Sequence, residues 1–112
     1  MQHRDSIILT KLLNELNIAI DMLNDMDFKQ FDSDEILKRA VCMTVINIGE
    51  LVKSLSPDIR LRYSDIPWKA IAGFRDIAAH KYQTLHMGDV YKTVKEDFPE
   101  LKHNIEIIKS DE

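Results

Sequence analysis

Apolar residues recur every three or four positions along most of this chain, which is the spacing of one face of an α-helix. The first such stretch predicts a helix from about Asp5 to Asp25, with Asp5 or Ser6 as its N-cap. Its apolar positions are Leu9, Leu12, Leu13, Leu16, Ile20 and Leu23. A polar segment, residues 25–31, separates this helix from the next.

A second and broader apolar pattern follows residue 32. Asp32, with Glu35 three residues later, has the sequence of a capping box and predicts the start of this helix. Ser56-Pro57 predicts its end, because a residue before proline disfavours the helical conformation. The expected apolar face consists of Ile36, Leu37, Ala40, Val41, Thr44, Ile48, Leu51, Val52 and Leu55.

A short turn or helical turn is predicted for residues 57–63, followed by a third helix. Asp65 as a cap and Pro67 in the first turn predict where that helix starts, and it is expected to end near Tyr82. The residues that it should direct toward the core are Ile71, Phe74, Ile77 and Ala78.

The last part of the chain predicts a fourth helix that starts near Gly88-Asp89. Pro99 should break or kink it, and Leu101, Ile105 and Ile108 then continue a C-terminal helical piece. No segment has the strict alternation of a β-strand. The fold predicted is therefore all-α, a compact four- to five-helix bundle that forms a single domain over residues 1–112.

Composition places this bundle among cytoplasmic proteins. The single cysteine, Cys42, excludes an internal disulfide framework, and its apolar neighbours suggest a buried thiol rather than a nucleophile. No apolar run is long enough to span a membrane, and the first residues lack the apolar stretch of a signal peptide. We therefore expect a cytoplasmic location without membrane association.

The charge is unevenly distributed along the chain. The net charge is −4, whereas nucleic-acid-binding domains are usually basic. Between Lys53 and Lys81, however, six basic residues against three acidic ones give +3. Such an island could hold a phosphate, although six basic residues in a stretch of this length is also near the average. The basic residues are Lys53, Arg60, Arg62, Lys69, Arg75 and Lys81.

Several classes of site are not supported by the residue pattern. The three glycines, Gly49, Gly73 and Gly88, are too far apart to form a phosphate-binding loop. The four histidines lack the spacing of metal ligands. We therefore expect neither a cofactor nor a metal site.

The residues best suited to chemistry are Arg75 and His80. Arginine offers a permanent cation with a forked set of donors, and histidine exchanges protons near neutral pH. Metal-free RNA cleavage needs a base at the ribose 2′-hydroxyl and a cation at the phosphate. Asp76 precedes His80 by four residues, so on a helix it could orient the imidazole.

Helix geometry separates Arg75 from His80 by about 140°, so the two do not share one face. Either the helix is distorted, or a second copy related by a two-fold axis completes the site. Spacing alone favours a solvated arginine and a half-buried histidine without a catalytic role, because such pairs occur in many helices by chance.

The segment Arg75-x-x-x-x-His80-x-Tyr82 matches the Arg-x-x-x-x-His-x-Tyr motif of the HepT-like toxins, and the chain resembles this family of HEPN-domain ribonucleases. The flanks are similar as well, most strongly over residues 45–101. They include Ile48-Gly49-Glu50, Leu55-Ser56-Pro57, Ile66-Pro67-Trp68 and the stretch from Val94 to Leu101.

This resemblance implies a homodimer with a metal-independent endoribonuclease site at the dimer cleft. It further implies a toxin whose antitoxin partner, a minimal nucleotidyltransferase, silences it by attaching AMP to Tyr82. The catalytic residues are then Arg75, His80 and Asp76, the last in place of a commoner Asn. Glu50 could line the cleft or be an ordinary helix carboxylate.

Two other interpretations of the function of this chain remain open. The chain could be a non-catalytic helical adaptor for a nucleotidyltransferase, or a helical interaction domain in which Arg75 and His80 are incidental. Trp68 and Tyr63 could stack on bases, although anchoring in the bundle is the favoured role for Trp68.

Overall fold

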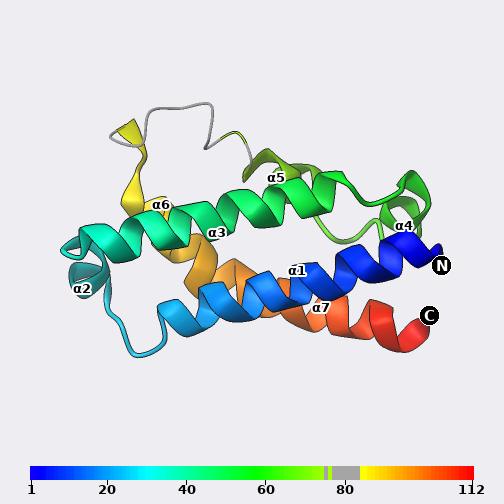
Figure 1. Cartoon of the computed structure of the whole chain (residues 1–112), viewed down its shortest axis with the longest axis horizontal. Helices are drawn as coiled ribbons and strands as arrows, with labels where there is room; N and C mark the ends of the chain where they lie inside the picture. Colours follow the sequence, from blue (N-terminus) through cyan, green and yellow to red (C-terminus); the bar gives the residue numbers. More distant parts are fainter. Residues whose placement is uncertain (75, 77–83) are drawn as a thin grey trace.

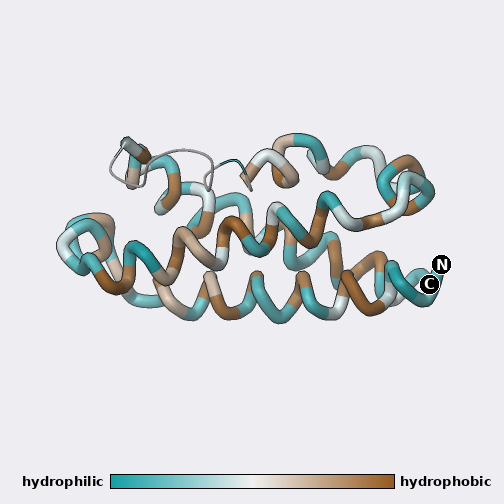
Figure 2. The backbone as a smooth tube through the Cα atoms, turned by 45° about the horizontal axis from the view of Figure 1, so that its top comes forward, coloured by the Kyte–Doolittle hydropathy of each residue, from teal (hydrophilic) through white to brown (hydrophobic). Residues whose placement is uncertain are grey.

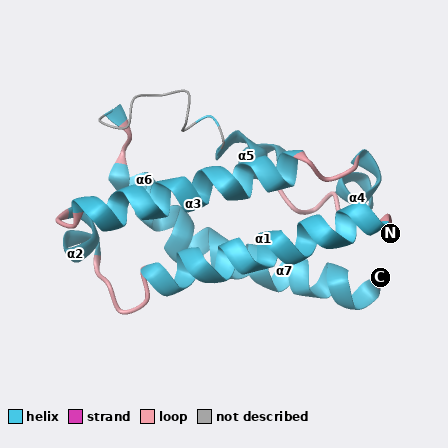
Figure 3. Cartoon of the chain, viewed as in Figure 1, coloured by secondary structure: helices cyan, strands magenta, loops and turns pink. Residues whose placement is uncertain are grey.

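The computed structural model describes residues 1–74, 76 and 84–112, and this part of the chain is made of helices and loops without a strand (Figure 3). The all-α prediction is confirmed. The elements are α1 (His3–Met22), α2 (Phe28–Asp32), α3 (Glu35–Lys53), α4 (Pro57–Arg62), α5 (Trp68–Ala72), α6 (Met87–Lys92), the π-helical turn η3 (Thr93–Asp97) and α7 (Phe98–Asp111).

Three long helices form the body of the molecule. α1 packs against both α3 and α7 and runs antiparallel to each of them, so the two chain ends lie at the same end of the bundle (Figure 1). The short helix α5 packs on α3. The resulting shape is elongated, with extents of 42 × 29 × 21 Å.

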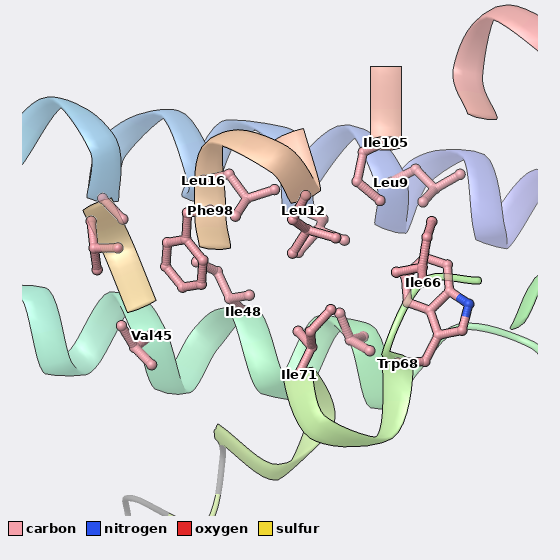
Figure 4. Packing of buried hydrophobic residues seen from close by; sticks show 14 of the residues in the cluster. Leu9, Leu12, Leu16, Val45, Ile48, Ile66, Trp68, Ile71, Phe98 and Ile105 are labelled. Atoms are coloured by element: carbon pink, nitrogen blue, oxygen red, sulfur yellow. The ribbon is translucent and has the colours of Figure 1, made fainter. Parts of the chain in front are cut away.

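The core lies where the apolar stripes of these helices meet. Leu12 and Leu16 of α1 are fully buried and face Ile48 of α3 and Phe98 of α7 (Figure 4). In the trace coloured by hydropathy, apolar and polar residues alternate along the long helices (Figure 2). The predicted apolar faces of the first and last helices thus do form the core.

The start of α1 differs from the prediction. The helix begins at His3, and its N-cap, Gln2, makes no side-chain capping bond. Asp5 is buried instead, with only 1% of its surface exposed. Its carboxylate accepts hydrogen bonds from the Ser56 backbone N–H at 2.9 Å and from the Ser56 hydroxyl at 2.6 Å. Asp5 therefore ties α1 to the N-cap of α4.

We expect Asp5→Ala to lower the free energy of unfolding by about 1–3 kcal/mol, because it leaves two polar groups of Ser56 without their acceptor. The measurement is urea denaturation followed by circular dichroism. Asp21→Ala, an exposed position on the same helix, is the matched control and should change stability by less than about 0.5 kcal/mol. Equal midpoints for the two variants would contradict the role given to Asp5.

The helix starts between α1 and α3 also differ from the prediction. The N-cap of α3 is Asp34, which accepts from the Leu37 N–H at 3.0 Å, and not Asp32. A capping box does occur, but at Asp27 and Gln30, where it opens the unpredicted helix α2. The reason is tertiary: α2 buries Phe31 completely, and that burial stabilises a helix too short to form alone.

The predicted apolar face of α3 is correct over its middle and wrong at its start. Ile36 is 83% exposed, because the first turns of α3 project beyond the end of α1 (Figure 1). α3 ends at Lys53, and Ser56 caps the next helix, with Pro57 in its first turn. The helical turn predicted for residues 57–63 is thus confirmed as α4.

The third predicted helix is shorter in the described part of the chain. α5 ends at Ala72, and its N-cap is Pro67 without a side-chain bond, so Asp65 is not the cap. The predicted end near Tyr82, with Ile77 and Ala78, lies outside the described residues.

The irregularity expected at Pro99 is present as a π-helical turn. η3 lies directly before Phe98-Pro99 and joins α6 to α7 without leaving the helical conformation. Proline lacks the N–H of a regular helix and crowds the preceding turn, so a wider turn at this point is a physical consequence. None of the described helices combines the length and apolar character needed to cross a membrane.

Candidate functional site

The segment before the motif is fixed to the bundle by buried apolar side chains. Ile66, Trp68 and Ile71 are each less than 10% exposed and point into the core (Figure 4). The Trp68 indole N–H donates to the Tyr63 carbonyl at 3.0 Å, so its polar atom is satisfied as well. Trp68 is an anchor, as favoured from the sequence.

The segment after the motif is fixed at α6. Val90 is buried, and the Tyr91 hydroxyl donates to the Met26 carbonyl at 2.7 Å. The Tyr91 ring lies against Phe28 and Phe31, with centroids 5.6 and 5.8 Å away. This aromatic cluster ties α6 to α2.

The two flanks of the motif meet at one place. Phe74 and Leu85 both line a hollow of about 220 Å³, together with Val45 of α3 and Val90 of α6. Phe74 also packs on Phe98, with ring centroids 6.0 Å apart. The described residues that flank the motif, Phe74 and Leu85, therefore lie at the same side of the bundle.

Three of the four predicted motif residues, Arg75, His80 and Tyr82, lie outside the described residues. Their joint action with Asp76 stays a prediction. Asp76 itself is exposed and lies at the edge of a shallow depression of about 660 Å³ formed by α3, α4 and α5.

Glu50 lies in a different depression. It is exposed on α3 and lines a hollow of about 350 Å³ between α1 and α3, with Lys11, Asn14 and Asn47 among its neighbours. The structure does not bring Glu50 together with Asp76 in one described cleft. Its role as a cleft residue remains a prediction.

One residue of the basic island, Arg62, is paired with a carboxylate within the fold. The Arg62 guanidinium holds Glu112 at 2.7 and 2.9 Å, and Tyr63 donates to the same carboxylate at 3.1 Å. Desolvation acts to raise the pKa of Glu112, but hydrogen bonds from Arg62 and Tyr63 outweigh it and hold the pKa below its ordinary value. Burial and the bond to Glu112 raise the pKa of Tyr63. Arg62 and Tyr63 are thus engaged within the fold.

The remaining candidates are structural or solvent-exposed. Cys42 is 4% exposed, and burial raises the pKa of its thiol, which confirms a buried thiol. His86 and His103 are exposed, and His86 Nδ1 lies 3.3 Å from Asp89. In the described ranges, no three His, Cys, Asp or Glu side chains lie close enough to hold a metal ion together.

Comparison with known proteins adds the family. The family described as Ribonuclease HepT-like matches residues 12–108. Two proteins of Methanocaldococcus jannaschii, each named as a candidate RNase, are 36% and 32% identical, covering 99% and 96% of this chain and 97% and 100% of their own length. A protein of Thermococcus cleftensis named as a probable ribonuclease HepT is 29% identical over 96% of each chain. No solved structure gives a significant match.

These matches span nearly the whole helical bundle and include the segment that carries the motif. They agree with the all-α architecture and with the sequence resemblance. The chain belongs to the HepT-like ribonuclease family.

Proposed function

We propose that this HepT-like ribonuclease is the toxin of a toxin–antitoxin pair and cleaves RNA internally without a metal ion. The observation that carries the proposal is the complete Arg75/His80/Tyr82 motif in a chain of this family. A non-catalytic adaptor would have no need of a base and a phosphate-binding cation at this spacing.

The chemistry follows from the two side chains. Neutral His80 takes the proton of a ribose 2′-hydroxyl, and the 2′-oxygen attacks the adjacent phosphorus. The bond from phosphorus to the 5′-oxygen breaks, and that oxygen receives a proton. Arg75 stabilises the charge that builds up on the phosphate oxygens. Asp76 is assigned to orienting the imidazole.

The working form is proposed to be a symmetric homodimer with Arg75 and His80 of both copies around one cleft. On an undistorted helix, as the sequence predicts for this segment, Arg75 and His80 would point about 140° apart, and a second copy would then be needed to complete the site. Support from the surface comes from apolar side chains that the described bundle leaves exposed, such as Ile36 at 83% and Met43 at 58%. A dimer would cover part of that area.

Regulation is assigned to a cognate minimal nucleotidyltransferase that transfers AMP to Tyr82 in the cytoplasm. A phenol two residues past His80 is a nucleophile close to the catalytic base in sequence. AMP on Tyr82 would bring a phosphate and a base to the place where RNA must bind.

The direct test is cleavage of a single-stranded RNA by the purified protein in excess EDTA. We expect the rate to be unchanged by the chelator, and the products to end in 2′,3′-cyclic phosphate and 5′-hydroxyl groups, because the 2′-oxygen is the nucleophile. Mass spectrometry of the fragments identifies the ends. Activity that EDTA removes, or 3′-hydroxyl ends, would refute this mechanism, and no cleavage at all would favour the adaptor.

A further inference from the structure

A basic depression that includes Asp76, the one described residue of the predicted site, lies at the end of the bundle where α3 finishes. Lys53 from the last turn of α3, Arg60 from α4 and Lys69 from α5 line it, with Asp76 at its edge. α4 and α5 lie next to the C-terminal end of α3 in the ribbon view (Figure 1). The three cations come from three separate helices, and the fold places them around one depression.

The described part of the fold does not neutralise these three cations. No ion pair joins Lys53, Arg60 or Lys69 to a carboxylate in the described part of the chain, whereas Arg62, two residues after Arg60, is held by Glu112. Lys53 and Lys69 are exposed. Among the described residues that line the depression, three are positively charged and one, Asp76, is negatively charged.

Arg60 supplies a second and independent observation. Its Nε is buried, and no acceptor for it exists among the described residues. Buried N–H groups nearly always have a partner in folded proteins, so a missing acceptor calls for an explanation. Guanidinium groups bind phosphate through their forked N–H donors, and Arg60 presents such a group to the depression that it lines.

The opposite side of α5 has the reverse charge. A hollow of about 170 Å³ between α5 and α7 has an apolar floor that includes Ile71 and Phe74, and Asp65, Asp97 and Glu100 line it. A polyanion approaching the motif is repelled from this side and attracted to the other. α5 thus separates an acidic surface from a basic one.

We infer that the basic depression binds backbone phosphates of the RNA strand next to the cleaved bond. The inference rests on the proposed ribonuclease function. In this arrangement the RNA strand contacts Lys53, Arg60 and Lys69 on its way to the motif and does not contact the acidic side of α5. These residues position the strand and do not touch the reacting atoms.

The test measures binding without cleavage. The probe is a single-stranded 2′-O-methyl RNA of about twelve nucleotides, within the length that single-strand sites cover and without the nucleophilic hydroxyl. Fluorescence anisotropy against the full chain gives Kd at several salt concentrations. We expect the triple variant Lys53→Gln/Arg60→Gln/Lys69→Gln to weaken binding by on the order of tenfold or more. The slope of the logarithm of the association constant against the logarithm of the salt concentration is negative, and we expect it to become less steep by about 2.

Two further variants keep the result interpretable. Lys53→Gln/Lys69→Gln changes only exposed side chains, so it can replace the triple variant if that protein folds poorly. We expect its salt slope to be less steep by about 1.4 than that of the unchanged protein. Lys29→Gln/Lys92→Gln/Lys102→Gln removes the same charge from α2, α6 and α7 and should leave the slope close to that of the unchanged protein. Equal slopes for the double variant and this control would overturn the inference.

Failure of the proposed function would look different. If the unchanged protein binds the probe through these residues but cuts no RNA, the phosphate site stands and the nuclease does not. If the protein cuts RNA and the double variant keeps both its KM and its salt slope, the nuclease stands and the phosphate site does not.

Discussion

Arg75→Ala and His80→Ala are each expected to lower the rate of RNA cleavage by on the order of 10²-fold or more, with unchanged helical content. Arg75 is the proposed cation at the phosphate, and His80 is the proposed base at the 2′-hydroxyl. The measurement is single-turnover cleavage of labelled RNA, paired with growth of cells that express each variant. Both variants should also lose growth inhibition.

Matched controls come from the same residue types elsewhere. Arg4→Ala on α1 and His103→Ala on α7 change exposed side chains and should retain close to full activity. Circular dichroism establishes that all four proteins keep their helices. If both motif variants remained as toxic as the unchanged protein, the catalytic site would have to lie elsewhere.

Mixing the two inactive variants tests whether the site is shared. If each catalytic site takes Arg75 from one copy and His80 from its partner, the cleft of a dimer holds two sites. In a mixed dimer one of these sites has neither motif residue and the other has both. An equal mixture should then recover roughly a quarter of the original activity. Light scattering gives the oligomeric state in parallel. A monomer that cuts RNA, or no recovery among mixed dimers, would confine the site to one chain.

The long helices could be predicted because their apolar spacing extends over many turns. Leu9, Leu12 and Leu16 are fully buried as the pattern requires. The starts of helices could not be predicted as well, because several side chains can cap the same stretch. Asp5 has the chemistry of an N-cap, but it is used to bind Ser56, 51 residues later in the chain. Only the tertiary fold decides between these uses.

The short helix α2 was missed for a related reason. α2 has five residues, too few to form alone, and it exists because Phe31 packs beneath Tyr91 from the far end of the chain. Ile36 shows the opposite error: it fits the apolar spacing of α3, but the helix that would cover it ends too soon. Spacing along one helix does not give the length of its neighbour.

The candidate site was predicted from a motif, and its surroundings needed the structure. The sequence placed six basic residues in one stretch without telling which of them are paired. In the fold, Arg62 forms an ion pair with Glu112, whereas Lys53, Arg60 and Lys69 line one depression. Pairing partners 50 residues apart carry no local signal, so this division could not be read from the sequence.

The modification of Tyr82 is the other large effect that we expect. Incubation with the cognate nucleotidyltransferase, ATP and Mg²⁺ should add AMP to the chain and abolish RNA cleavage. In that step the phenol oxygen bonds to the α-phosphorus of ATP, the bond to the β-phosphate breaks, and pyrophosphate leaves with the phenol proton lost to a base. The attached phosphate adds negative charge beside the motif, where it can occupy Arg75 and repel RNA.

Tyr82→Phe should cut RNA and resist this silencing, because it removes only the acceptor oxygen. Tyr63→Phe is the matched control: it removes a phenol that is engaged with Glu112 and leaves Tyr82 as the acceptor. Intact-mass spectrometry should show gains in multiples of AMP for the unchanged protein and for Tyr63→Phe, and none for Tyr82→Phe. The same gain on Tyr82→Phe would place the modification on another residue. A Tyr82 that packs its ring and hydrogen-bonds locally would gain no mass in the unchanged protein either, and silencing would then have to arise from binding of the antitoxin alone.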